Sequence, residues 1–391
     1  MPKVYLNVKA STWNKESFEL FDYDTKNLAK RNFKVTETTC IYRENLKVSY
    51  SQQPLPSEST ENSLKIIGII HKTQNSFLIK PPSLNRNYTS NQYEDLWMCT
   101  KGLKSDYRIS EGDVIRLGRV SIRVLEISGF KKSHQKKPFI FAKDIPKEGL
   151  AQELLQKPQQ ATQTVELATE QIPCRICLSE ESSTEDPLIK PCQCSGTMAV
   201  VHLSCLGHWL RSKVSVKRKR DTQSYLCGKL ECELCKQKFS EQISIEDQKH
   251  SLISINKPED KYLVLEALNE DQTPSSLHVV SLRNKKYFSL GRSHRCDVKL
   301  SDISVSREHS YIRVSKKGLY FEDNNSKFGS LVKVNKPIAI QKGNEVLLQA
   351  GKTLLNLSVQ KKLGLFSCFG LQSKEKPSEH SLRDITQESV C

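Results

Sequence analysis

Two stretches determine the fold of the middle of the chain. Residues 173–213 read PCRICLSEESSTEDPLIKPCQCSGTMAVVHLSCLGHWLRSK, and residues 231–239 read ECELCKQKF. Eight of the thirteen cysteines lie between Cys174 and Cys235, counting both ends. In a chain that lacks a secretory signal, cysteines clustered in this way favour metal ligands over disulfides.

The candidate ligands form close pairs of thiolate and imidazole donors, and four such pairs can complete two tetrahedral zinc shells. The sequence between the pairs is small and polar and could hardly fold without metal. We therefore expect zinc to supply the folding free energy of this segment. In chain order the pairs are Cys174 and Cys177, Cys192 and Cys194, His202 and Cys205, and Cys232 and Cys235.

The length and composition of the chain restrict the class of protein to which it can belong. A length of 391 residues suggests two or three domains, and no run approaches the roughly 18 apolar residues that a membrane-spanning helix needs. The first thirty residues are charged throughout and lack the apolar core of a signal peptide, so we expect an intracellular protein, cytoplasmic or nuclear, without a membrane span. The net charge of +16 favours acidic partners without choosing among them.

The cysteine segment resembles the RING-CH (RING-variant) family. The matching motifs are CRIC, PCQCSGTM, VHLSCLGHWL and CELCK, with a ligand order of four Cys, one His and three Cys, and Trp209 shortly after the sixth ligand. A PHD finger shares the ligand order, but its third and fourth ligands are usually further apart. It also normally carries a Trp before the seventh ligand, where this chain has Leu230.

The resemblance implies a cross-brace of two zinc ions. One ion would be held by Cys174, Cys177, His202 and Cys205, and the other by Cys192, Cys194, Cys232 and Cys235. We expect Cys227 and His208 not to be ligands, since Cys227 lies outside a Cys-x-x-Cys pair and His208 falls in a predicted helix. The 26 residues between Cys205 and Cys232 are long for the family and include KVSVKRKRD.

RING-type ligases bind a ubiquitin-conjugating enzyme loaded with ubiquitin and hold the thioester in a reactive pose, so that the rate comes from orientation. By resemblance, Ile176 and Trp209 would form the apolar docking groove for that enzyme. Lys236 would lie where such domains carry a cation that bridges enzyme and ubiquitin. The alternative left open by the residues is core packing for the two apolar side chains and a solvated charge for Lys236.

The C-terminal region carries many short strand-like runs with turn residues between them, as in a β-sandwich. It resembles a forkhead-associated (FHA) domain through Gly291-Arg292, through Ser306-Arg307-Glu308-His309, and through Ser326 to Gly329 followed by Ser330. A dianionic phosphate requires a guanidinium group together with hydroxyl and backbone donors.

In the FHA family the positions of Arg292 and Ser306 contact the phosphate of phosphothreonine, the position of Arg307 often helps, and that of His309 is structural. This chain departs from the family at Phe328, where an Asn normally holds the peptide backbone. The departure leaves two readings open, a phosphate pocket or another protein-interaction role.

A related pattern occurs earlier in the chain, in EGDVIRLGRVSIRVLEI, which alternates as a hairpin hinged near Gly118. Aligning Gly112 with Gly343 puts two apolar strands after each glycine. Whether this region is a degenerate FHA-like copy without a phosphate site stays open. The basic run RSKVSVKRKR, residues 211–220, favours a solvated loop over a nuclear import signal or a site for phosphate or ubiquitin, and nucleic-acid binding is disfavoured because no aromatic or recognition-helix pattern accompanies the charge.

We therefore expect a multidomain, mainly β protein. Its predicted parts are an unassigned region (1–63), a β-rich region (64–128), a linker (129–171), a RING-CH module (172–240), a linker (241–258), an FHA sandwich (259–360) and a disordered tail (361–391).

The leading interpretation is a RING-type ubiquitin ligase that uses no covalent intermediate. It would bind two zinc ions, recruit a conjugating enzyme and target threonine-phosphorylated proteins through its FHA domain. The presence of both Ile176 and Trp209 favours this interpretation. The alternatives are a non-enzymatic zinc-containing scaffold that binds phosphopeptides and, third, a basic nuclear protein that binds nucleic acid.

Overall fold

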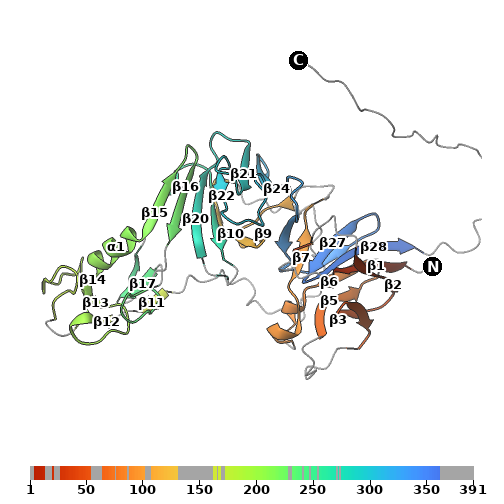
Figure 1. Ribbon diagram of the computed structural model, residues 1–391, viewed down its shortest axis with the longest axis horizontal. Coiled ribbons are helices and arrows are strands. Elements are labelled where there is room, and N and C mark those ends of the chain that lie inside the picture. Colours follow the sequence, from red (N-terminus) through yellow and green to blue (C-terminus); the bar gives the residue numbers. More distant parts are fainter. Residues whose placement is uncertain are drawn as a thin grey trace, which may run out of the picture.

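The chain is mainly β, as predicted, and α1 (Leu203–Ser212) is the only α-helix in the part that the structure describes (Figure 1). No helix within that part has the length and apolar character needed to cross a membrane. Most of the predicted first linker and nearly all of the predicted tail lie outside the described residues. The computed structural model describes residues 4–13, 20–21, 27–53, 64–74, 76–85, 88–101, 107–130, 162–164, 166–168, 172–227, 231–239, 242–245, 248–252, 255–269, 272 and 274–361.

Ten strands arise from residues 4–130, which we call the first half. Alternating β-branched and aromatic residues account for them, because such side chains pack well on a pleated surface. The predicted hairpin hinged at Gly118 is confirmed, and the φ of 60° at that glycine permits the tight turn. The strands are β1 (Val4–Trp13), β2 (Leu28–Val35), β3 (Thr39–Glu44), β4 (Lys47–Ser51), β5 (Leu64–Lys72), β6 (Phe77–Lys80), β7 (Leu96–Cys99), β8 (Tyr107–Arg108), β9 (Val114–Leu117) and β10 (Val120–Ile127).

Ten further strands arise from residues 255–361, the second half. Gly343 and Gly112 precede equivalent hairpins, β27–β28 and β9–β10, with φ angles of 86° and 83°. The strands are β19 (Tyr262–Leu268), β20 (Pro274–Ser281), β21 (Tyr287–Gly291), β22 (Val298–Lys299), β23 (Ser310–Ser315), β24 (Gly318–Asp323), β25 (Ser330–Lys333), β26 (Ile338–Ile340), β27 (Glu345–Ala350) and β28 (Thr353–Lys361).

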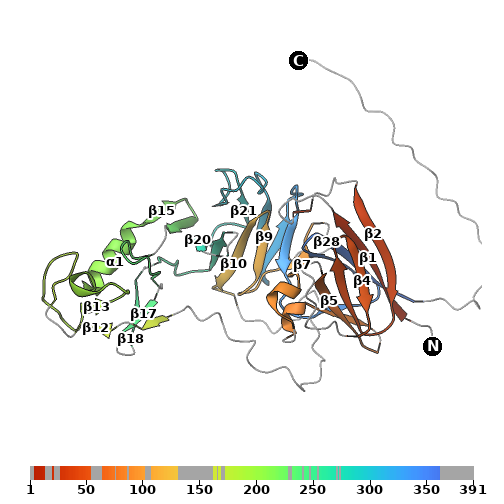
Figure 2. The ribbon, with the colours of Figure 1, turned by 60° about the horizontal axis from the view of Figure 1, so that its bottom comes forward.

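The two halves exchange their last three strands. In the large sheet the order β20-β19-β10-β9-β25-β7-β27-β28-β1-β2 places the hairpin of each half between strands of the other half. The two five-stranded sheets are β22-β21-β23-β24-β8 and β4-β3-β5-β6-β26. In each of them the edge strand, β8 or β26, comes from the other half. The order reads alike from both ends, with β25 and β7 paired at the centre. Figure 2 shows β9 and β10 on the β20 side of the molecule, far from β1 and β2.

One buried core fills this interleaved structure, which we call the β body. It runs continuously from Leu6 and Val8 near the start of the chain to Leu357 near its end. Ile122 of β10 pairs opposite Ala267 of β19, so a side chain of the first half is buried in the second. The two β regions that the sequence separates into 64–128 and 259–360 therefore share their sheets and their core.

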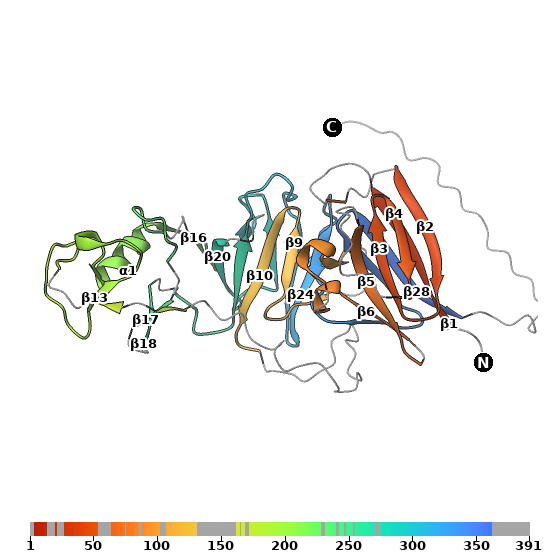
Figure 3. The ribbon, with the colours of Figure 1, turned by 90° about the horizontal axis from the view of Figure 1, so that it is seen from below.

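The cysteine-rich module, residues 172–252, lies between the two halves in sequence and at one end of the molecule in space (Figure 3). Leu206 and Leu210 of α1 pack with Ile189 and Ile243 in a separate core. The predicted second linker contributes two strands, Gln242–Ile245 and Gln248–Ser251, and its side chains Ile243, Ile245 and Leu252 are buried in this core. The strands near or in the module are β11 (Thr162–Thr164), β12 (Glu166–Leu167), β13 (Leu188–Lys190), β14 (Val201–His202), β17 (Gln242–Ile245) and β18 (Gln248–Ser251).

The long insertion between Cys205 and Cys232 forms a hairpin, β15 (Val214–Arg218) and β16 (Thr222–Cys227), which we call the hairpin arm. Part of the basic run is thus a strand rather than the loop that the sequence favoured. β16 pairs with β20, so the arm extends the large sheet of the β body at its edge. Tyr225 of β16 is buried in a small apolar cluster with Val264 and Leu277.

The exchange predicts that the two halves unfold together. Leu117 in β9 is fully buried beside β25, and replacing it with Ala should lower the free energy of unfolding by about 2–5 kcal/mol. Hydrogen–deuterium exchange should then show lost protection in both β1–β2 and β19–β20. Tyr287→Ser, at a half-exposed position, is the control and should leave both pairs protected. Loss confined to residues 4–130 would contradict the exchange.

Candidate functional site

The first cluster of predicted ligands is assembled by three elements of the module. Cys174 and Cys177 come from a turn, His202 from the end of β14, and Cys205 from the first turn of α1. Their donor atoms lie within 4.8 Å of one another, and Cys177 Sγ is 3.2 Å from His202 Nδ1. His202 Nε2 donates to the carbonyl oxygen of Glu181 at 2.6 Å, which leaves the Nδ1 lone pair directed at the cluster.

The second cluster contains Cys192, Cys194, Cys232 and Cys235, again with all donor atoms within 4.8 Å of one another. The Sγ atoms of Cys192 and Cys194 lie 3.6 and 3.7 Å from that of Cys232. Thiolates held at about 2.3 Å in a tetrahedron are about 3.8 Å apart, so the donor set fits a zinc ion. The two groups are those that the cross-brace predicts.

Two turns of the same backbone conformation supply four of the eight candidate ligands, one Cys-x-x-Cys pair to each cluster. Leu178 and Lys236, each just after a Cys-x-x-Cys pair, have φ angles of 63° and 61°, and their N–H groups donate to the carbonyl oxygens of Cys174 and Cys232. Burial raises the pKa of the Cys174 thiol, but N–H groups from Cys177, His202 and Ile176 outweigh it and lower that pKa to about 6. The pKa of Cys232 is lowered to about 6 in the same way. Each cluster therefore holds at least one thiol that ionises readily.

The predicted enzyme-docking residues differ in exposure. Ile176 is 45% exposed, whereas Trp209 is half-buried, with its ring centroid 6.1 Å from that of Phe239 in an edge-on contact. Lys236 is exposed. Three other apolar residues of the module outside the hairpin arm are exposed and were not predicted as docking residues, namely Leu178, Met198 and Leu234. Leu234 stands in its Cys-x-x-Cys pair where Ile176 stands in the other, and this repeated position could have revealed it.

The predicted phosphate-contact residues meet at one end of the second half. Arg292 directly follows β21, and its N–H donates to the carbonyl oxygen of Ser306 at 3.0 Å. The N–H of Ser293 donates in the same way to Arg307 at 3.0 Å. Both arginines are exposed, and neither forms an ion pair with any described residue. The backbone segments that carry Arg292, Ser306 and Arg307 are thus joined by hydrogen bonds.

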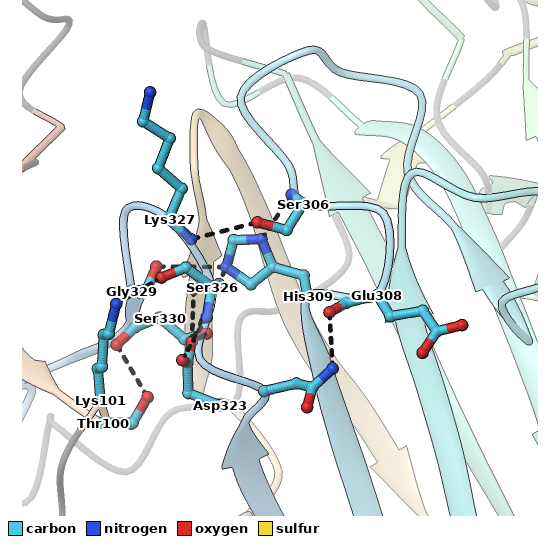
Figure 4. A network of polar contacts seen from close by, with 11 residues as sticks. Thr100, Lys101, Ser306, Glu308, His309, Asp323, Ser326, Lys327, Gly329 and Ser330 are labelled. Carbon is cyan, nitrogen blue, oxygen red and sulfur yellow. Dashed lines mark hydrogen bonds and ion pairs between the residues drawn. The ribbon is translucent and has the colours of Figure 1, made fainter. Parts of the chain in front are cut away.

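A buried network fixes the loops around this point (Figure 4). His309 is fully buried, its Nδ1 accepts from the N–H of Ser306 at 3.0 Å, and its Nε2 donates to the carbonyl oxygen of Gly329 at 3.3 Å. Burial lowers the pKa of His309, so the neutral ring acts as acceptor and donor at once. Asp323 accepts from the N–H and the hydroxyl of Ser326 at 2.9 and 2.7 Å. His309 is therefore structural, as the resemblance implied.

The first half also holds this loop. Lys101 Nζ donates to the carbonyl oxygen of Ser326 at 2.7 Å, and Thr100 donates to that of Ser330 through both its N–H and its hydroxyl (Figure 4). The N–H of Lys327 then donates to Ser306 Oγ at 3.2 Å. No sequence pattern links these positions, because the contacts join residues more than 220 apart.

At Phe328, where the FHA family has Asn, the ring is half-buried and lies 5.3 Å from Lys327 Nζ. A phenyl ring offers no amide to a peptide backbone. The ring instead forms a cation–π pair with the ammonium group of Lys327.

Comparison with known proteins places two families on the chain. Residues 174–235 match the RING-variant domain, and residues 288–355 match the FHA domain. The E3 ubiquitin-protein ligase MARCHF3 of Xenopus tropicalis is 43% identical over 67 residues, which are 17% of this chain and 20% of that protein. The E3 ubiquitin-protein ligase MARCHF7 of Rattus norvegicus is 38% identical over 74 residues, 19% of this chain and 10% of that protein.

The chain therefore matches a fifth or less of the length of these relatives. With the ligand clusters and the loop network described above, the two matches mean that this polypeptide combines a RING-variant domain with an FHA domain.

Proposed function

We propose that the protein is a RING-type ubiquitin ligase that recruits a ubiquitin-conjugating enzyme through its RING-variant domain and threonine-phosphorylated proteins through its FHA domain. The observation that carries the proposal is the pair of Cys/His clusters in a module that leaves Ile176 exposed. The match to the RING-variant domain and the similarity to two proteins named E3 ubiquitin-protein ligases support it.

Two zinc ions would be held by the eight clustered side chains, one ion in each cluster. Zinc supplies folding free energy to such a module. The chain itself provides ionisable thiols at Cys174 and Cys232 and fixes the ring of His202 through Glu181. Because all eight donors would be occupied, none of these cysteines is proposed as a nucleophile.

Ubiquitin transfer would depend on orientation rather than on a group of this protein that reacts. Ile176 would supply apolar contact area to the conjugating enzyme, and its exposure argues against a role in core packing. Trp209 would present the part of its ring that Phe239 and Lys213 leave uncovered. Lys236 would contribute a cation from the turn after the last ligand.

Phosphothreonine would bind where Arg292, Ser306 and Arg307 meet. The two guanidinium groups can pair with a dianionic phosphate, and such charge-assisted hydrogen bonds are stronger than neutral ones. The N–H of Lys327 orients the hydroxyl of Ser306. The rival function is a scaffold without ubiquitin transfer, which would keep the zinc and the phosphopeptide site and lose only the conjugating enzyme.

The zinc assignment predicts two zinc ions per chain by metal analysis. Cys192→Ser should release zinc and expose the whole module to protease, because each ion ties together distant parts of it. Cys227→Ser is the matched control and should keep both ions, since Cys227 stands outside the eight ligand positions of the RING-CH pattern. A content of about one ion in the natural protein, or zinc loss in the control, would refute the assignment.

Ile176→Ala should reduce ubiquitin-chain formation at least about 10-fold, because it removes apolar area from a contact that is centrally buried in the complex. Its zinc content and melting temperature should not change. Val216→Ala, at a comparably exposed aliphatic position on the hairpin arm, should retain activity. If Ile176→Ala loses zinc, the residue is structural. If the natural protein is inactive with a broad panel of conjugating enzymes, the scaffold function is favoured.

Arg292→Ala should weaken binding of a phosphothreonine peptide at least about 30-fold at fixed salt, since a lost charge-assisted hydrogen bond typically costs about 2 kcal/mol. Lys316→Ala, on the exposed turn between β23 and β24, should have little effect. Calorimetric titration should use the full chain, because Lys101 and Thr100 hold the binding loop. Equal affinity for phosphorylated and unphosphorylated peptides would rule out a phosphate pocket.

A further inference from the structure

The tip of the hairpin arm carries charge that neither zinc binding nor enzyme docking uses. Four consecutive cations, Lys217 to Arg220, are exposed there. Lys217, Arg218 and Arg220 form no ion pair with any residue that the structure describes. The neighbouring carboxylate of Asp221 is directed instead to Lys285, whose Nζ lies 3.8 Å away, and it forms no ion pair with these three cations.

Strand pairing directs this tip toward the phosphate-contact residues. Thr222 pairs opposite Val280 near the end of β20, and the N–H of Ser281 donates to the carbonyl oxygen of Asp221 at 2.8 Å. Lys219 Nζ then donates to the carbonyl oxygens of His294, at 3.0 Å, and of Cys296. The tip is therefore attached to the loop between β21 and β22, at the same end of the sheet (Figure 1).

That loop begins with Arg292 and continues the positive charge. Arg295 is exposed and lacks an ion pair with any described residue. The Cys296 thiol donates to the carbonyl oxygen of Arg307 at 3.1 Å, so the loop lies directly on the segment that carries Ser306 and Arg307. From the hairpin tip to the phosphate-contact residues, each step is a hydrogen bond between neighbouring cationic segments.

We propose that the hairpin tip and the loop between β21 and β22 form one cationic surface that binds acidic residues flanking the phosphothreonine, so that the ligand is an acidic phosphopeptide. The proposal rests on the proposed phosphothreonine site and adds a specificity to it. A peptide bound in this way touches the RING-variant module itself, since the arm is inserted between the sixth and seventh candidate ligands. Nucleic acid is the less favoured ligand, because the exposed tip offers no aromatic side chain for stacking.

The test measures binding of four peptides and one oligonucleotide to the full chain at two salt concentrations. The peptides share one core sequence, with phosphothreonine or threonine at its centre and with acidic or neutral flanks. The arm variant combines Lys217→Ser, Arg218→Ser and Arg220→Ser, and it keeps Lys219 because that side chain holds the loop. The control variant combines Lys316→Ser, Lys317→Ser and Lys336→Ser, which removes the same charge from exposed positions on other loops.

We expect the natural chain to bind the acidic phosphopeptide about 10-fold more tightly than the neutral one, as three screened charge contacts allow, with the difference shrinking at high salt. The arm variant should lose this preference and bind the neutral phosphopeptide normally, and the control variant should keep it. Unchanged zinc content and circular dichroism establish that both variants fold.

Equal affinity of the natural chain for both phosphopeptides, or a preference that survives in the arm variant, would overturn the inference and leave the phosphothreonine site standing. If phosphorylation makes no difference to affinity, the proposed phosphothreonine site is wrong. Binding of the unphosphorylated acidic peptide then tests the cationic surface by itself. Binding of that peptide that depends on the arm supports it, and absence of such binding overturns it. Tighter binding of the oligonucleotide than of either acidic peptide through the arm also overturns it.

Discussion

Antiparallel pairing across the exchanged strands is the constraint on which the rest of the molecule depends. In the large sheet, β9 and β10 of the first half connect β25 to β19 of the second half, and β27 and β28 of the second half connect β7 to β1 of the first. Because buried backbone groups must be paired, neither half presents a complete sheet by itself in this arrangement. The phosphate-contact loops also depend on pairing between the halves, since Thr100 and Lys101 reach them from the end of β7, which pairs with β25.

The candidate site was largely predictable because its chemistry is encoded locally. Close spacing brings Cys174 and Cys177 together, and the pairing implied by the RING-CH resemblance brings His202 to them. Arg292 and Ser306 were placed by motifs that describe adjacent loops. Asp323 was not found, because a buried carboxylate that organises serine donors looks like any acidic turn residue in sequence.

The exchange itself could not be predicted. Alternation of apolar residues identifies a strand but not its partner. The repeat that aligns Gly112 with Gly343 makes the two hairpins equivalent, so the sequence fits either partner equally well. The hairpin arm was obscured for a different reason. Four consecutive cations at its tip conceal the alternation of its first strand, and its pairing with β20 is a long-range contact.

Equivalent hairpins also set an order of events during synthesis. At about 5–20 residues per second, the ribosome releases β9–β10 roughly 10–50 s before β27–β28. During that interval the first half has only its own hairpin with which to complete its sheet. A first half that paired with its own hairpin in that interval would have to release it before the later hairpin could take its place. The time available for such premature pairing is set by the speed of translation.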